Sequence, residues 1–199
     1  MPVPVIYYIR HGETEWNAEG KLQGMRDIPL NDLGRKQAAQ AGSILADLFV
    51  RDGRCETSLE FVASPLCRAR STMELVREAL GLPPRLYQVD DRLREIGYGR
   101  WEGATLAETE ISDPELYVRR QAEKWTVPPP GGESYVQVQA RVSDWYDQLR
   151  GDTVAVAHGG TGRALMVALG IETPQTAAEL TIEQGAVYVF NDGGLSKYS

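Results

Sequence analysis

Two apolar runs, one near each end of the chain, finish in a histidine followed by a glycine, and this pair constrains the fold more than any other feature. His11 ends the run that starts at Val5, and His158 ends the run that starts at Thr153. Each run is typical of a buried strand, and each glycine of the sharp turn after it. Because ligands bind beyond the carboxyl ends of strands in open α/β sheets, we expect both imidazoles at one rim of a sheet. The chain has no other histidine.

Strand and helix patterns alternate along the chain, which predicts an α/β fold. We expect a three-layer α/β/α sandwich with a mostly parallel central sheet and helices on both of its faces. Asn31 is a suitable cap for one helix, and Gly151 a suitable terminator for another. The expected strands are 3–10, 59–63, 86–89, 153–157 and 186–190, and the expected helices are 31–52, 65–80, 137–149 and 162–169.

The bulk properties fit one domain, residues 1–199, since 42% of the residues are hydrophobic and 25% are charged. The net charge of −7 argues against nucleic-acid binding, which needs a basic surface. No apolar run approaches the roughly 20 residues that cross a bilayer, and the first residues lack the pattern of a signal peptide. With Cys55 and Cys67 as the only cysteines, we expect reduced thiols and a cytoplasmic protein. The sequence leaves the oligomeric state open.

The segment 96–132 breaks this alternation and is rich in aromatic residues and proline. We expect an insertion that passes over the active edge of the sheet after its third strand. Such insertions act as lids or specificity elements, and the equal alternative is a layer that only packs. Residues that would line the entrance in the first case are Tyr98, Trp101, Arg119, Arg120 and Trp125.

Two arginines are placed to hold an anion beside the first histidine. Arg10 directly precedes His11, and its guanidinium offers forked donors that suit phosphate oxygens. Arg68 opens the helix after the second strand, where free N–H groups also favour an anion. Arg70 lies about 200° further round that helix and should point elsewhere.

The loop after the third strand offers a carboxylate, and the turn after His158 offers backbone donors. Glu95 lies among apolar neighbours and is our candidate proton donor, whereas Glu102 more naturally belongs to the turn around Gly103. Gly159 and Gly160 are able to present N–H groups to phosphate oxygens. We expect Arg163 to be a surface charge of the following helix.

Motifs of other phosphate or hydrolytic chemistries are absent from the sequence. There is no Gly-x-x-x-x-Gly-Lys-Ser/Thr loop, no His-Glu-x-x-His and no Gly-x-Ser-x-Gly. The position where a cysteine phosphatase has arginine, after Cys67 and five more residues, is Met73. Two histidines cannot supply the usual zinc sites, whereas a magnesium site made only of carboxylates stays open.

At this point the ordered set of motifs resembles the histidine phosphatase superfamily, in its phosphoglycerate mutase-like branch (branch 1). Any one motif is weak evidence, but together they follow the family's order and span most of the chain. The matching segments are 10–14 with Asn17, 30–34, 64–66 with Arg68, Ala69 and Thr72, 93–95 with Gly99 and 101–103, 132–134, and His158 with Gly159.

The resemblance implies a phosphoglycerate mutase-like fold and assigns roles to individual residues. His11 would become a phosphohistidine, and Glu95 would be the general acid and then the base. Neither a metal ion nor another cofactor is expected, and the partner would be a small phosphorylated metabolite. The groups that would hold the phosphoryl oxygens or the substrate are Arg10, Asn17, Gln23, Gly24, Arg68, His158 and Gly159.

Three functions are compatible with this resemblance. We favour a metal-independent phosphatase of small phosphomonoesters, because the chain looks shorter than true mutases and a smaller lid exposes a phosphohistidine to water. The alternative is a cofactor-dependent phosphoglycerate mutase. A non-catalytic phosphate-binding module is disfavoured, because every expected catalytic side chain is present. The physiological substrate stays open.

Overall fold

A six-stranded sheet, in the order β3-β2-β4-β1-β5-β6, forms the centre of the computed structural model, which describes residues 4–192 and 194–199. Strand β1 pairs in parallel with β4, and β2 pairs in parallel with both β4 and β3. The edge formed by β5 and β6 is antiparallel. The expected mostly parallel sheet is therefore confirmed. The strands are β1 (Ile6–Arg10), β2 (Glu60–Ala63), β3 (Gln88–Val89), β4 (Thr153–Ala157), β5 (Val187–Asn191) and β6 (Gly194–Tyr198).

The strand boundaries differ from expectation mainly at the sheet edges. Strand β3 is only two residues long, and Leu86, expected within it, is exposed. Strand β6 was not expected, because its Gly-Leu-Ser-Lys-Tyr sequence has little apolar character. The expected first strand began at Val3, which lies outside the described residues. Edge strands bury little, so their sequences carry a weak apolar signal.

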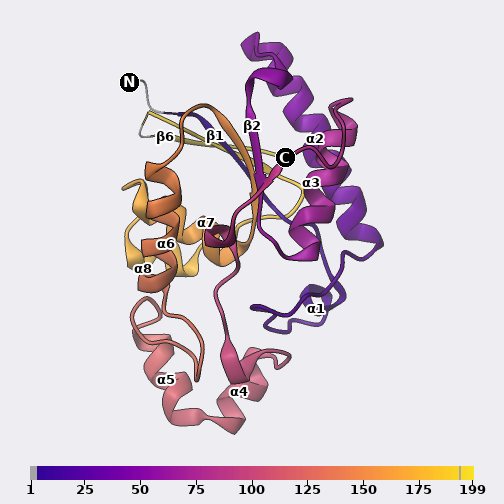
Figure 1. Ribbon diagram of the computed structural model, residues 1–199. Coiled ribbons are helices and arrows are strands. Elements are labelled where there is room, and N and C mark those ends of the chain that lie inside the picture. The colour runs from indigo at the N-terminus through magenta and orange to yellow at the C-terminus, as the bar shows by residue number, and fades with distance from the viewer. Residues whose placement is uncertain (1–3, 193) are drawn as a thin grey trace.

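Helices cover both faces of the sheet, so the three-layer sandwich is also confirmed (Figure 1). On one face lie α2 (Asp32–Asp52) and α3 (Cys67–Ala79), and on the other α6 (Tyr135–Asp147), α7 (Gly159–Ala168) and α8 (Pro174–Glu179). The two faces have separate apolar cores. Along β1, Tyr7 and Ile9 join the α2–α3 core, while Ile6 and Tyr8 join the other. This alternation follows from the two-residue period of a strand.

Two helices begin earlier than the sequence pattern indicated. Helix α6 begins at Tyr135 because Ser134 and Gln137 form a reciprocal capping box. Helix α7 begins at Gly159, directly after His158, although it was expected from Gly162. Glycine has a low helix propensity, and this is why the pair Gly159–Gly160 reads as a turn in the sequence.

The segment 96–132 contains η3 (Gly99–Trp101), α4 (Leu106–Ser112) and α5 (Pro114–Ala122), and in Figure 1 both helices lie at the end of the molecule away from the N-terminus. Its tryptophans pack: Trp101 is buried, and Trp125 stacks on Tyr135 with ring centroids 4.8 Å apart. The remaining short elements are α1 (Glu15–Ala18), η1 (Glu56–Ser58) and η2 (Asp91–Leu93). No helix among the described residues is long and apolar enough to span a bilayer.

A close approach of two backbones joins the loop after β1 to the start of α2. A Cβ atom on Gly12 would lie 2.1 Å from the carbonyl oxygen of Gly34, and one on Gly34 would lie 2.1 Å from that of Glu13. Real Cβ contacts are never this short, so both positions require glycine. The contact holds the loop that carries His11 against the start of α2.

We predict that Gly34→Ala lowers the free energy of unfolding by about 1–3 kcal/mol, because the new methyl group meets a main-chain oxygen that cannot move freely. Helix propensity alone predicts the opposite sign, since alanine is favoured over glycine by about 1 kcal/mol within a helix. Urea denaturation measures the change. The control is Gly151→Ala, where a Cβ atom meets nothing within 4 Å. Equal stability of the two variants would contradict the packing argument.

Candidate active site

The register of β1 and β4 brings the two histidines together. Arg10 pairs with Ala157 across the parallel ladder, and the backbone N–H of His11 donates to the Ala157 carbonyl at 3.0 Å. His11 and His158 directly follow these two strands. Their ring centroids lie 5.0 Å apart, and both side chains are buried. The expectation that both imidazoles meet at one rim of the sheet is confirmed.

The hydrogen bonds of His11 fix its tautomer. Its Nε2 lies 3.3 Å from Nε of Arg68, which has only donors to offer, so Nε2 accepts. Its Nδ1 lies 2.7 Å from the carbonyl oxygen of Gly12 and must therefore carry the proton. Burial lowers the pKa of His11 well below its usual 6.5, and the charges of Arg68 and Arg10 lower it further. The ring is neutral, with a lone pair on Nε2.

Arg68 connects His11 to the loop that follows α1. It is fully buried, and beyond its contact with His11 it donates to the carbonyl oxygens of Arg26 at 2.6 Å and Gly24 at 2.8 Å. Each terminal nitrogen keeps a second N–H. Arg70 on the same helix is exposed and lies 3.5 Å from the Tyr87 hydroxyl, as expected.

His158 makes three hydrogen bonds, two through its backbone and one through Nε2, and its other ring nitrogen has no partner. The Tyr8 hydroxyl donates to the His158 carbonyl oxygen at 2.6 Å and accepts from its N–H at 3.1 Å. Nε2 lies 2.7 Å from the Ser64 hydroxyl. Nδ1 is buried with no hydrogen-bond partner, and burial lowers the pKa of the ring well below 6.5. A buried orphan atom of this kind usually marks the place of a ligand or water.

The Glu95 carboxylate is fixed by two backbone donors. Oε1 accepts from the N–H groups of Ile96 at 2.9 Å and Gly160 at 3.0 Å. A Cβ atom on residue 160 would lie 2.4 Å from this oxygen, so the second glycine after His158 makes room for Glu95. The expectation that Gly160 offers its N–H to phosphate is wrong for this structure, because the carboxylate already accepts it.

His11 and Glu95 both line one pocket of about 150 Å³. Its lining includes all the proposed site residues except His158, which lies behind it against His11, and no described residue between 99 and 158 lines it. The sequence missed Lys21, Leu22 and Arg163, whereas Tyr98 was expected at the entrance. The lining residues are Arg10, His11, Asn17, Lys21, Leu22, Gln23, Gly24, Arg68, Glu95, Tyr98, Gly159, Gly160 and Arg163.

Arg163 corrects the expectation of a surface charge. Its Nε donates to the Leu180 carbonyl oxygen at 2.7 Å and its Nη1 to the Tyr135 hydroxyl at 3.0 Å, which holds the side chain at the pocket. The error follows from the helix start. Because α7 begins at Gly159, residue 163 lies one turn inside the helix rather than at its first turn.

Two other polar groups support the walls. Glu102 does not line the pocket, and its Oε1 accepts from the N–H groups of Met25 at 3.0 Å and Tyr98 at 3.2 Å. Asn17 lines the pocket, and its Oδ1 accepts from Nε2 of Gln184 at 3.1 Å. Within residues 4–192 and 194–199, no three His, Cys, Asp or Glu side chains gather as a metal site would require.

Comparisons with known proteins agree on one family. Residues 6–194 match the model of the histidine phosphatase superfamily (branch 1). A 2,3-bisphosphoglycerate-dependent phosphoglycerate mutase from Methylocella silvestris is 33% identical over an alignment of 195 positions, which covers 94% of this chain and 91% of that protein. The structure of a mycobacterial glucosyl-3-phosphoglycerate phosphatase, complexed with VO3, has 31% identity and a TM-score of 0.79, covering 94% of this chain and 90% of that one.

We predict that stability falls as the pH is lowered from 7 to 5, because both buried histidines stay neutral in the folded protein while the unfolded chain protonates them below about pH 6.5. Each histidine contributes up to about 1.4 kcal/mol per pH unit in this range. The measurement is urea denaturation in phosphate-free buffer at several pH values.

The matched variant for this test is His158→Gln, which removes one of the two groups. Its stability should depend less steeply on pH than that of the wild type. An unchanged slope would mean that His158 is protonated equally in both states and would contradict its neutral state in the folded protein.

Proposed function

Since the chain belongs to the histidine phosphatase superfamily (branch 1), we propose that it is a metal-independent phosphatase that hydrolyses small phosphomonoesters through a phosphohistidine on His11. The proposal treats residues 1–199 as one domain. The tautomer of His11 supports it, because the lone pair on Nε2 belongs to a neutral imidazole beside two guanidinium groups. A nucleophile and fixed positive charge are the two things that phosphoryl transfer needs from a protein.

The composition of the pocket wall is the observation that favours a phosphatase over a mutase. No described residue between 99 and 158 lines the pocket, so α4 and α5 do not enclose the reacting groups. A mutase must keep water away from its phosphoenzyme, and a wall to which the insertion contributes only Tyr98 leaves a phosphohistidine open to hydrolysis.

The second candidate function is a phosphoglycerate mutase, which is the name that the Methylocella relative carries. The length of the chain does not separate the two functions. The alignment with the Methylocella mutase spans 94% of this chain and 91% of that protein, so the two are of similar length. The expectation that this chain is shorter than the mutases is therefore wrong for this relative. The choice between phosphatase and mutase rests on the pocket wall and on the assay described below.

In the proposed mechanism, Nε2 of His11 attacks phosphorus while the bond to the ester oxygen breaks. Glu95 gives its proton to the leaving oxygen, which departs as an alcohol. The same carboxylate then takes a proton from a water molecule, which attacks the phosphohistidine and releases inorganic phosphate. Arg10, Arg68 and Nδ1 of His158 donate to the phosphoryl oxygens, where charge builds up. Asn17, Gln23, Gly24 and Gly159 complete the phosphate-binding set.

We predict that the wild type hydrolyses p-nitrophenyl phosphate in the presence of EDTA and that His11→Ala lowers kcat/KM by about 10³-fold or more, because the covalent intermediate is lost. Phosphate release is followed colorimetrically. On α3, Arg68→Gln should also lose most activity, whereas Arg70→Gln, at an exposed position of the same helix, should keep it. Equal rates for wild type and His11→Ala would sink the proposal.

The mutase reading is tested with 3-phosphoglycerate and a catalytic amount of 2,3-bisphosphoglycerate. Steady release of inorganic phosphate supports a phosphatase. Fast isomerisation with little phosphate release would replace the phosphatase proposal by the alternative.

The charge of the pocket also bears on the substrate. Arg10 and Arg68 suffice for one phosphoryl group, and Arg163 adds a further fixed cation on the pocket wall. We predict that Arg163→Gln raises KM about tenfold for phosphoesters with a second anionic group, because an ion pair at a partly buried site is lost, and leaves KM for p-nitrophenyl phosphate nearly unchanged. Steady-state kinetics on phosphoglycolate and p-nitrophenyl phosphate measure this. Equal changes on both substrates would contradict it.

A further inference from the structure

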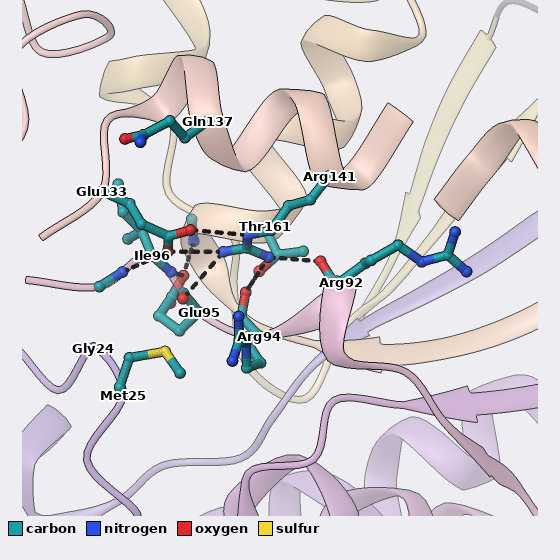
Figure 2. A network of polar contacts seen from close by, with 12 residues as sticks. Gly24, Met25, Arg92, Arg94, Glu95, Ile96, Glu133, Gln137, Arg141 and Thr161 are labelled. Atoms are coloured by element: carbon teal, nitrogen blue, oxygen red, sulfur yellow. Dashed lines mark hydrogen bonds and ion pairs between the residues drawn. The ribbon is translucent and has the colours of Figure 1, made fainter. Parts of the chain in front are cut away.

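One arginine outside the pocket holds the backbone on both sides of Glu95. Arg141 on α6 reaches three carbonyl oxygens in the segment 92–95: its Nη1 donates to those of Arg92 at 2.6 Å and Arg94 at 2.7 Å, and its Nη2 to that of Glu95 at 3.2 Å. Figure 2 shows this side chain reaching down from the helix into the segment. Arg92 lies in the short helix η2, and Arg94 and Glu95 follow in the irregular stretch before η3, where no regular element pairs their carbonyl oxygens.

Glu133 completes the arrangement and orients the guanidinium. Its two carboxylate oxygens accept from Nε and Nη2 of Arg141, both at 3.2 Å. Oε2 also accepts from the N–H of Gly97 at 2.9 Å, and the N–H of Glu133 donates to the Gly97 carbonyl oxygen at 2.8 Å. The dashed lines in Figure 2 follow this chain of contacts from Arg141 to both sides of Glu95. The backbone at 92–97 is thus fixed on both sides of the carboxylate.

Arg141 cannot act on a substrate directly. It does not line the pocket, its side chain is only 14% exposed, and every nitrogen of its guanidinium already donates. Its removal would leave the partly buried carbonyl oxygens of Arg92 and Glu95 without a donor, whereas that of Arg94 would keep the Thr161 hydroxyl at 2.9 Å. Each lost partner costs up to about 1–3 kcal/mol and favours movement of the segment. Any effect on the reaction must therefore pass through the position of Glu95.

We propose that Arg141, oriented by Glu133, is a positioning residue that holds the Glu95 carboxylate where it protonates the leaving oxygen. This inference rests on the proposed function, since it requires that Glu95 is the general acid. It adds Arg141, which lies on α6, to the residues on which the reaction depends. It also gives the Gly-Glu-Ser segment 132–134 a second role, because Glu133 orients Arg141 while Ser134 caps α6.

The test uses two substrates that differ in their need for an acid. The nitrophenolate of p-nitrophenyl phosphate leaves readily without a proton, whereas the alkoxide of an alkyl phosphate such as glycerol 2-phosphate does not. We expect Arg141→Gln to lower kcat/KM on the alkyl ester by about 10²-fold, as for a misplaced catalytic group, and on the aryl ester by less than about fivefold. kcat/KM reports the step in which the ester bond breaks.

A double-mutant cycle then asks whether Arg141 acts through Glu95. Glu95→Gln should show the same preference for the aryl ester, and adding Arg141→Gln to it should cost little more. Arg141→Lys keeps a donor for the carbonyls and should recover part of the loss. If Arg141→Gln does not fold, Glu133→Gln and Arg141→Lys provide the same comparison in milder form.

The matched control is Arg77→Gln. Arg77 is also buried and donates to a main-chain oxygen, that of Pro83, but lies away from the pocket, so its loss should lower stability without changing the ratio between substrates. An equal loss on both esters after Arg141→Gln, or a full further loss in the Glu95→Gln background, would overturn the inference. If Glu95→Gln itself shows no dependence on the leaving group, the proposed function fails first, because Glu95 is then not the acid.

Discussion

The parallel pairing of β1 with β4 is the contact on which the rest of the site depends. It sets Arg10 opposite Ala157 and so makes neighbours of His11 and His158, which stand almost at opposite ends of the chain. A slip of one residue would turn every side chain of a strand to the other face of the sheet. Because each face has its own apolar core, such a slip would bury the wrong residues on both sides. The sandwich therefore enforces the register, and the register assembles the site.

Burial and positive charge act together on the two imidazoles. Both rings are removed from water and face guanidinium groups, so each stays neutral. The lining of the pocket holds four cationic side chains, Arg10, Lys21, Arg68 and Arg163, and one carboxylate, Glu95. In a chain with a net charge of −7, this local excess of cations favours an anionic ligand at the pocket.

The sequence predicted the sheet, its two helical layers and most of the pocket, because strand ends followed by glycine are visible without coordinates. His11, His158, Glu95 and the two arginines beside them came together as expected. Arg163 was misjudged because two glycines concealed the true start of α7. Strand β6 was missed because an edge strand needs little apolar sequence. The role of Arg141 had no sequence signal, since its acceptors are main-chain oxygens that any residue type provides.

Arg68 donates hydrogen bonds both to His11 and to the loop after α1. Its Nε–H now uses the lone pair of His11 Nε2, and its other nitrogens hold the carbonyl oxygens of Gly24 and Arg26. In the proposed mechanism, bonding of phosphorus to Nε2 consumes that lone pair, so this guanidinium must exchange one partner in every turnover. The same guanidinium therefore connects the backbone at Gly24 and Arg26 to the phosphorylation state that the proposed mechanism assigns to His11.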